Sequence, residues 1–187
     1  MNVILFGPPG AGKGTQAQFI VNKFKLFQVS TGELLRSEVK NQTIIGKEIE
    51  NIISDGKFAN DEIVNKLIEN FISDPKKKNN LIFDGYPRSL SQVKNLELLL
   101  IKSNQIIDFI FFLNVNKETI IKRINKRKDL ENRPDDNSNT IMKRFDKYME
   151  TTKPVLDYYS KKTNFFEIDG DQKIDEISTK IEQILTV

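Results

Sequence analysis

Cysteine and histidine are both absent from this chain of 187 residues. Without cysteine, the chain can form neither a disulfide nor a thiolate metal site. Without histidine, it lacks the commonest general base and the commonest metal ligand. Any catalysis must therefore use Lys, Arg, Asp or Glu side chains, hydroxyl groups, backbone amides or a borrowed metal ion.

Long hydrophobic runs are also lacking. The longest, Ile106–Leu113, is interrupted by Asp108 and is far too short to cross a bilayer. The apolar run in the first ten residues (MNVILFGPPG) has no charged leader before it and no small-residue cleavage site after it, so we interpret it as a buried strand rather than a signal peptide. We therefore expect a cytoplasmic protein that has no membrane partner.

The length and composition favour one domain over residues 1–187. A chain of this size can bury a substantial core as a single α/β domain but is short for two. Hydrophobic residues make up 38% and charged residues 29%, which is typical of a soluble globular protein. The net charge of +3 is modest, and the lysine-rich runs Lys76–Lys78 and Lys122–Lys128 fit solvated helix faces. We expect no nucleic-acid partner.

Arginine is scarce, because 23 of the 29 basic residues are lysine. The planar guanidinium group grips phosphate through two hydrogen bonds at once, which the point charge of lysine cannot do. The positions that keep arginine are therefore candidate phosphate ligands. They are Arg36, Arg88, Arg123, Arg127, Arg133 and Arg144.

Short apolar runs alternate with longer amphipathic segments along the chain. This alternation predicts a parallel sheet that is covered by helices on both faces. The predicted strands are Asn2–Phe6, Phe27–Val29, Leu81–Phe83, Ile107–Leu113 and Phe165–Ile168. The predicted helices are Lys13–Phe24, Thr31–Lys40, Ile44–Ser54, Asp61–Ser73, Leu90–Lys102, Lys117–Lys126, Thr140–Lys161 and Ile174–Leu185.

Two segments depart from this alternation. Residues from about 30 to 60 insert two helices after the second strand, and Lys128–Asn137 (KDLENRPDDN) is predicted to be a polar loop because Pro134 breaks any helix. Helix starts are marked by capping residues. The expected caps are the capping boxes Ser30-x-x-Glu33 and Ser89-x-x-Gln92 and the N-caps Asn60 and Asn116.

The strongest motif is the glycine-rich segment Gly7–Thr15 (GPPGAGKGT), which follows the first predicted strand and opens a helix. Such a loop wraps around phosphates so that its backbone amides and the helix N-terminus face the anion, while Lys13 reaches the β- and γ-phosphates. The usual pattern places Ser or Thr directly after the lysine. Here Gly14 intervenes, and Thr15 carries the hydroxyl that would face Mg²⁺. An ordinary glycine-rich turn is the alternative.

A second motif, residues 81–88 (LIFDGYPR), ends an apolar strand in Asp84. Phosphate-binding loop proteins place a carboxylate at such a point near the nucleotide's Mg²⁺, usually through water. Taken alone, Asp84 would more simply cap a turn or helix. Arg88, four residues later and before a capped helix, favours a phosphate site.

Together these motifs resemble those of adenylate kinases. The matching segments are GPPGAGKGTQ, STGELLR (Ser30–Arg36), DGYPRSLSQ (Asp84–Gln92) and KRINKRKD…NRPDDN…IMKRF, in order over essentially the whole chain. The resemblance implies reversible transfer of the terminal phosphate of Mg-ATP to AMP, giving two ADP. It also implies a three-layer α/β P-loop NTPase fold: a five-stranded parallel sheet, a helical NMP-binding insertion at about 30–59 and a short lid loop at about 127–137.

The resemblance assigns roles to individual positions. The implied ATP-binding residues are Gly10, Ala11, Gly12, Lys13, Gly14, Thr15, Arg127 and the backbone at Gln172. The implied AMP-binding residues are Thr31, Arg36, Lys57, Phe58, Ala59, Gly85, Tyr86, Pro87, Arg88, Gln92, Arg133 and Arg144. The implied catalytic residues are Lys13, Arg88, Arg127, Arg133 and Arg144. Arg123 is expected to have a supporting role.

The resemblance also bears on cofactors and partners. Mg²⁺ bound with ATP is the expected cofactor, held to the protein through water. The longer form of the family often carries four zinc-binding cysteines in an inserted lid, whereas here only five residues separate Arg127 from Arg133 and cysteine is absent. We therefore expect no zinc and no other metal ligand set. The expected partners are ATP, AMP and ADP, and the protein is expected to be a monomer.

Several alternatives remain at this stage. Gln92 could merely complete a capping box, Thr31 could be a first-turn helix residue, and Arg36 could be solvated. Arg133 could form a local ion pair with Asp135 or Asp136.

Two other functions can be weighed against an AMP kinase. A kinase for UMP and CMP usually has Asn after the Pro-Arg pair, where this chain has Ser89. A GTPase would use Asn-Lys-x-Asp, but in Asn125–Asp129 (NKRKD) the aspartate falls one place late.

Overall fold

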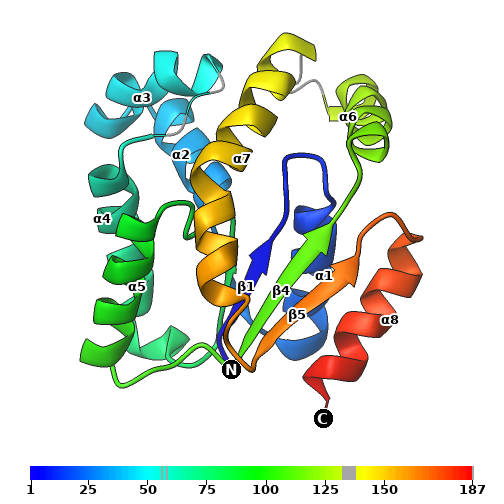
Figure 1. Cartoon of the computed structure of the whole chain (residues 1–187). Coiled ribbons are helices and arrows are strands. Elements are labelled where there is room, and N and C mark those ends of the chain that lie inside the picture. The colour runs from blue at the N-terminus through cyan, green and yellow to red at the C-terminus, as the bar shows by residue number, and fades with distance from the viewer. Residues whose placement is uncertain (56, 58, 132–137, 187) are drawn as a thin grey trace.

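The protein contains a single sheet of five parallel strands (Figure 1). The structure, a computed structural model, describes residues 1–55, 57, 59–131 and 138–186, and residues 127–131 and 138–142 as backbone only. The strands are β1 (Val3–Phe6), β2 (Phe27–Ser30), β3 (Leu81–Asp84), β4 (Phe109–Asn114) and β5 (Phe165–Asp169). This confirms the predicted parallel α/β sheet, with strand ends that shift by one or two residues.

The sheet order is β2-β3-β1-β4-β5, so that β1 lies at its centre. Val3 of β1 is in register with Ile82 on one side and with Phe109 on the other. Strands buried on both faces have apolar residues at every position, as β1 does. This places the turn after β1 at the middle of the sheet's carboxyl edge, where parallel α/β sheets bind ligands.

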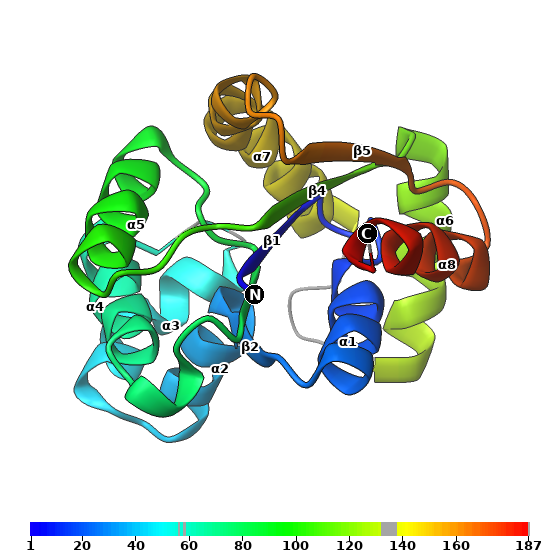
Figure 2. The same ribbon diagram turned by 90° about the horizontal axis from the view of Figure 1, so that it is seen from below.

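Helices cover both faces of the sheet (Figure 2). The predicted bounds of five are confirmed: α1 (Lys13–Phe24), α2 (Thr31–Lys40), α3 (Ile44–Ser54), α5 (Leu90–Lys102) and α8 (Ile174–Leu185). The others are α4 (Asp61–Ile72), α6 (Lys117–Glu131), α7 (Ser138–Tyr159) and the short 3₁₀ helix η1 (Pro75–Lys77).

Alternate residues of β1 point into two separate cores. Ile4 and Phe6 pack in a core with residues of α3, α4, α5 and α7. Val3 and Leu5 pack in the other core, with residues of α1, α6 and α8. Because side chains alternate along a strand, one short strand joins both layers of helices. The helices on the two faces of the sheet are thereby packed against the same central strand.

Helix α6 is longer than the sequence predicted. It runs to Glu131 rather than to Lys126, so that residues 128–131 of the expected polar loop are helical. Lys, Leu and Glu are good helix formers, and a proline disfavours helix chiefly at its own position and the one before. Pro134 itself and the rest of the loop through residue 137 lie outside the described residues.

Ser30, Asn60, Ser89 and Asn116 are confirmed as N-caps, but the described hydrogen bonds of Ser30 and Ser89 include only the N-cap half of each expected capping box. The side-chain oxygen of each cap accepts a hydrogen bond from a backbone N–H in the first turn of the helix it precedes. The pairs are Ser30 with Glu33 at 3.4 Å, Asn60 with Glu62 at 2.8 Å, Ser89 with Gln92 at 3.1 Å and Asn116 with Thr119 at 2.8 Å.

The two helices inserted after β2 meet at very close range. A Cβ atom on Gly46 of α3 would lie 2.0 Å from the backbone oxygen of Glu38 in α2. Glycine therefore lets the two helix backbones touch. Thr43 joins them as well, since its hydroxyl donates to the Glu38 carboxylate at 2.5 Å and caps α3.

The long helices of the protein are amphipathic rather than apolar throughout. In the part of the chain that the structure describes, none of them combines the length and apolarity that crossing a bilayer requires.

Candidate active site

The glycine-rich segment forms the turn between β1 and α1. Gly10 and Gly12 have φ angles of +83° and +94°, in the left-handed region that favours glycine. Gly12 is the N-cap of α1 and contributes no side-chain hydrogen bond to the helix start. The first N–H groups of a helix need partners, and a phosphate supplies them where no side chain does.

Lys13 lies across this turn. Its Nζ atom donates hydrogen bonds to the backbone oxygens of Gly7 at 2.7 Å and Pro8 at 3.1 Å. These bonds hold the ammonium group at the mouth of the loop. A nucleotide whose α- and β-phosphates occupied the loop would bring its terminal phosphate to this charge.

Arg123 of α6 connects the turn to a second loop. One terminal nitrogen donates to the backbone oxygen of Ala11 at 3.2 Å, and the other donates to that of Gln172 at 3.4 Å. Gln172 follows β5 and precedes α8, so three separate segments meet at this side chain. The sequence predicted a supporting role for Arg123, and this bridge is compatible with one.

Asp84 stands at the carboxyl end of β3, in register with Leu5 of the central strand. Gln28 of β2 donates a hydrogen bond from Nε2 to its Oδ2 at 3.2 Å. Among the residues that the structure describes, no three His, Cys, Asp or Glu side chains are grouped closely enough to hold a metal ion. One carboxylate near a phosphate-binding loop suits Mg²⁺ that arrives with a nucleotide and keeps most of its waters.

Gly85 fixes the position of Arg88. The Gly85 backbone oxygen accepts hydrogen bonds from the Thr31 hydroxyl at 3.0 Å and from Arg88 Nε at 2.6 Å. Gly85 has a φ of +75°, and a Cβ there would lie 2.7 Å from a terminal nitrogen of Arg88. The glycine therefore allows the guanidinium group to fold back over the chain and sets its plane.

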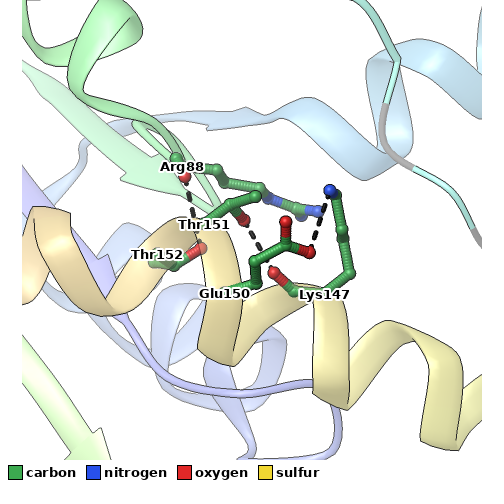
Figure 3. A network of polar contacts seen from close by, with 5 residues as sticks. All are labelled: Arg88, Lys147, Glu150, Thr151 and Thr152. Carbon is green, nitrogen blue, oxygen red and sulfur yellow. Dashed lines mark hydrogen bonds and ion pairs between the residues drawn. The ribbon is translucent and has the colours of Figure 1, made fainter.

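Arg88 is also attached to α7. Its backbone oxygen accepts a hydrogen bond from the Thr152 hydroxyl at 3.4 Å (Figure 3). One turn earlier on the same helix, Lys147 and Glu150 form an ion pair at 3.1 Å. The contact at Thr152 holds the start of the Ser89-capped helix against α7, which carries Arg144.

A first pocket lies among α2, α3, α4, α5 and α7, beside the loop that follows β3. It has three arginines together with several apolar side chains and the amide of Gln92. Its lining residues are Thr31, Gly32, Leu35, Arg36, Ile53, Lys57, Ala59, Val64, Gly85, Arg88, Gln92 and Arg144. The sequence predicted eight of these as AMP-binding, and the structure brings them together in one cavity.

A second pocket continues from the first toward the glycine-rich turn. It is lined by Leu5, Phe6, Gly7, Pro9, Lys13, Gly85, Pro87, Arg88, Arg144, Tyr148 and Thr152. Gly85, Arg88 and Arg144 line both pockets. The two cavities are therefore bounded by the same two arginines, and Lys13 lines the second cavity.

The charges at this junction affect one another. The pKa of Arg88 is lowered to about 10, chiefly by burial and also by the nearby charge of Arg144, while the charge of Asp84 opposes the shift. The guanidinium group remains charged at neutral pH. Two positive groups side by side are stabilised when an anion lies between them, so the junction favours a phosphate.

Gln92 is held by partners that differ from the predicted ones. Its Oε1 accepts from the backbone N–H of Arg88 at 2.7 Å, and its Nε2 donates to Asp61 Oδ1 at 2.6 Å. The prediction of a Ser89/Gln92 capping box is therefore half wrong, because Ser89 caps the helix but the Gln92 side chain does not return to the Ser89 N–H. The first-turn position of Asp61 in α4 suggests no more than an ordinary helix-start acid.

Tyr86, which the resemblance implies to bind AMP, lines neither described pocket. Its side chain is fully buried, and its hydroxyl lies within hydrogen-bond distance of two acceptors, Asn65 Oδ1 at 2.9 Å and the Gln92 backbone oxygen at 3.2 Å. Burial raises the pKa of this hydroxyl to about 12. Its aromatic ring belongs to the core and lines neither described pocket.

Part of the predicted site cannot be placed. Phe58, Arg133 and the centre of the lid lie outside the described residues, and of Arg127 the structure describes only the backbone in α6. Gly14 and Thr15 lie in the first turn of α1 and are exposed.

The family model described as adenylate kinase matches residues 5–164. The chain belongs to the adenylate kinase family. It is similar to the adenylate kinase of Pelagibacter ubique (strain HTCC1062), with 48% identity and all of both chains aligned. It is 39% identical to that of Azobacteroides pseudotrichonymphae, over 97% of this chain and 95% of the relative. It is also 36% identical to that of Caulobacter sp. (strain K31), over 100% and 99%.

These relatives of the family differ in length. The alignment with the Pelagibacter ubique protein extends over 213 positions, although this chain has 187 residues. At least 26 of those positions are therefore gaps in this chain. The alignment with the Caulobacter protein spans 187 positions. Family members thus exist both with and without the additional residues.

Proposed function

We propose that this protein transfers the terminal phosphate of Mg-ATP to AMP, reversibly, giving two molecules of ADP. The observation that carries the proposal is the pair of connected pockets that share Arg88 and Arg144. One pocket leads to the glycine-rich turn and Lys13, and the other ends among apolar side chains and the Gln92 amide. A donor nucleotide and an acceptor nucleotide could thus meet with their phosphates at the shared arginines.

The donor nucleotide binds at the glycine-rich turn between β1 and α1. Gly10–Thr15 surround its phosphates with backbone N–H groups, and Lys13 neutralises the terminal ones. Arg123 holds the turn against the loop at Gln172, whose backbone meets the base side. Mg²⁺ supplies positive charge on the phosphate oxygens, and Asp84 and Thr15 are the groups that would hold it through water.

The acceptor nucleotide occupies the first pocket. Arg36, Arg88 and Arg144 bind its phosphate, and their planar forks suit the phosphate oxygens better than lysine would. Thr31 and Gln92 meet the adenine base, while the backbone at Lys57 and Ala59 and the side chain of Val64 bound its apolar faces. Phe58 is proposed to contribute backbone there as well.

The transfer requires positioning and charge rather than a protein base. The acceptor oxygen belongs to a phosphate that is already anionic, so the absence of histidine is no obstacle. Arg88 and Arg144 stabilise the charge that spreads over the transferred group, and they act most strongly where water is excluded. The segment at about 127–137 is proposed to be a short lid without zinc, and its two arginines, Arg127 and Arg133, are proposed to complete the positive field around the phosphates.

The setting of the protein is also a proposal. We expect a cytoplasmic monomer, because the composition fits a soluble globular chain and both proposed pockets are formed by one protomer. A kinase for UMP and CMP remains the second candidate. It shares this fold and phosphate chemistry, and only the base end of the first pocket separates the two.

An acceptor screen tests the proposal. The purified protein is mixed with Mg-ATP and, separately, with AMP, CMP, UMP, GMP or dTMP, and the formation of ADP is followed. Strong turnover with AMP alone, and the reverse reaction from ADP, would support the proposal. Turnover with CMP or UMP would change the acceptor but keep the mechanism. GTP hydrolysis without any acceptor, together with inactivity toward all five, would replace the kinase with a nucleotide-dependent switch.

A further inference from the structure

The Gln92 side-chain amide forms hydrogen bonds with two partners of opposite character, a donor at its oxygen and an acceptor at its nitrogen. The side chain is only 4% exposed. The Arg88 backbone N–H lies 2.7 Å from Oε1, and the Asp61 carboxylate lies 2.6 Å from Nε2. Asp61 does not line the pocket, whereas Gln92 does. Asp61 therefore connects to the first pocket through its hydrogen bond to Gln92 rather than by lining the pocket itself.

The chemistry of the two partners decides which way the amide faces. A backbone N–H can only donate, so the amide atom in front of it must be the oxygen. An ionised carboxylate can only accept, so the atom in front of it must be the nitrogen. A flipped amide would place donor against donor at Arg88 and acceptor against acceptor at Asp61. The two partners thus hold a single orientation.

Asp61 is itself held in place. Its second oxygen, Oδ2, accepts from the Ser89 hydroxyl at 2.6 Å, while the Ser89 oxygen also caps α5. Asn60, just before it, caps α4. The carboxylate is therefore fixed by the two helix starts that meet here, and it connects α4 to α5 across the base end of the pocket.

The fixed amide keeps one N–H and one oxygen lone pair for the pocket. Adenine presents an acceptor at N1 beside a donor at its 6-amino group, which match that N–H and that lone pair. A 6-oxo purine presents the reverse, a donor at N1 beside an acceptor at O6. It would be matched only by a flipped amide.

We propose that Asp61 is a positioning residue that locks the Gln92 amide and thereby selects 6-amino over 6-oxo purine nucleotides. The inference rests on the proposed AMP function of the first pocket. It differs from the simpler role that the position suggests. An acidic residue in the first turn of a helix favours the helix dipole, and the Ser89 contact would also serve only to join two helices.

The test compares AMP with IMP as acceptor, in the wild type and in three variants. Asp61→Ala removes the acceptor in front of Nε2, and Asp61→Asn keeps an acceptor oxygen without the charge. Glu62→Gln is the matched control, since it removes one negative charge from the same first turn of α4 at an exposed side chain. kcat and KM for both acceptors and for ATP are measured, with thermal unfolding of each variant.

We expect Asp61→Ala to lower the ratio of kcat/KM for AMP over IMP by about tenfold, the size of one hydrogen bond to a charged group. The loss should appear as a higher KM for AMP, with the KM for ATP unchanged. Asp61→Asn should lie between Asp61→Ala and the wild type, and Glu62→Gln should keep the wild-type ratio.

A wild-type AMP/IMP ratio in both Asp61 variants would overturn the inference, even if they unfold at a lower temperature, because Asp61 would then only join the helices. An equal fall of the AMP/IMP ratio in Glu62→Gln would also overturn the inference. The cause would then be the loss of any negative charge from the first turn of α4, rather than the contact between Asp61 and Gln92. If Asp61→Ala does not fold, the ratio in Asp61→Asn decides alone. Failure of the proposed function is distinguishable, because the wild type itself would not use AMP.

Discussion

The donor side and the acceptor side of the site are constructed differently. On the donor side, the phosphate-binding turn is one continuous segment, Gly7–Thr15, and its lysine bonds to the turn's own backbone oxygens. On the acceptor side, the pocket collects residues from α2, α3, α4, α5 and α7 and from the loop that follows β3. The first depends on local backbone geometry, whereas the second depends on how distant helices pack.

The difference has consequences for how each side responds to change. A continuous turn keeps its shape as long as its glycines adopt their left-handed conformations. The acceptor pocket instead depends on joints such as the close contact of α2 with α3 at Gly46 and the contact of Asp61 with Gln92. We therefore expect acceptor-side substitutions to alter AMP use or stability, and donor-side substitutions to alter ATP use alone.

The largest effect is expected at the junction that belongs to both sides. Arg88→Lys replaces a fork held by Gly85 with a point charge, and it should lose at least about 3 kcal/mol of transition-state stabilisation, comparable to one preorganised donor. kcat/KM for both substrates measures this, and Lys94→Ala, at an exposed position of α5, is the control. Near-normal turnover of Arg88→Lys would exclude a role at the transferred phosphate.

The next largest effect is expected at the close contact between the inserted helices α2 and α3. Gly46→Ala places a methyl group on the backbone of α2 and should destabilise the protein by about 2 kcal/mol, as overpacking does. Gly14→Ala is the matched comparison for stability, because a Cβ there meets nothing within 4 Å. Urea unfolding of both variants gives the difference. Equal stabilities would show that α3 can shift without cost.

A smaller effect is expected at the base end of the acceptor pocket. Gln92→Leu removes the amide that is proposed to face adenine and should raise the KM for AMP about tenfold, with the KM for ATP unchanged. Steady-state kinetics with each substrate varied in turn measures both constants. Equal increases for ATP and AMP would argue against an adenine contact at Gln92.

The smallest effect tests the donor side. Arg123→Ala breaks the two hydrogen bonds to the Ala11 and Gln172 backbone, and we expect the KM for ATP to rise about fivefold, equivalent to about 1 kcal/mol. The KM for AMP should remain unchanged, since Arg123 lines neither described pocket. A rise for AMP of the same size would mean that the two sides are coupled through α6.

The sequence predicted most of the fold because its signals are local. Five helices have the predicted bounds, and the caps at Ser30, Asn60 and Asn116 are confirmed. The errors occur where a local rule is extended too far. Pro134 predicts a loop from residue 128 onward, yet α6 continues to Glu131 because good helix formers fill that stretch.

The candidate site shows the same contrast between local features, which the sequence predicted, and long-range contacts, which it did not. The glycine pattern with Lys13 and the scarcity of arginine are local or compositional features, and they indicate phosphate chemistry on their own. The sequence did not indicate which side chain holds Gln92, because Asp61 is 31 residues away and has the position of a helix-start acid. Nor did it indicate that Arg123 would bond to Ala11, 112 residues distant.

The sequence by itself therefore determined the phosphate-binding turn, the order of strands and helices and the residues able to bind phosphate. The tertiary structure decided that two pockets join at Arg88 and Arg144, and that one amide faces one way. The physical reason is the range of the interactions. Backbone conformation and capping depend on neighbours a few residues away, whereas burial and hydrogen bonding between packed helices depend on segments that meet only when the chain has folded.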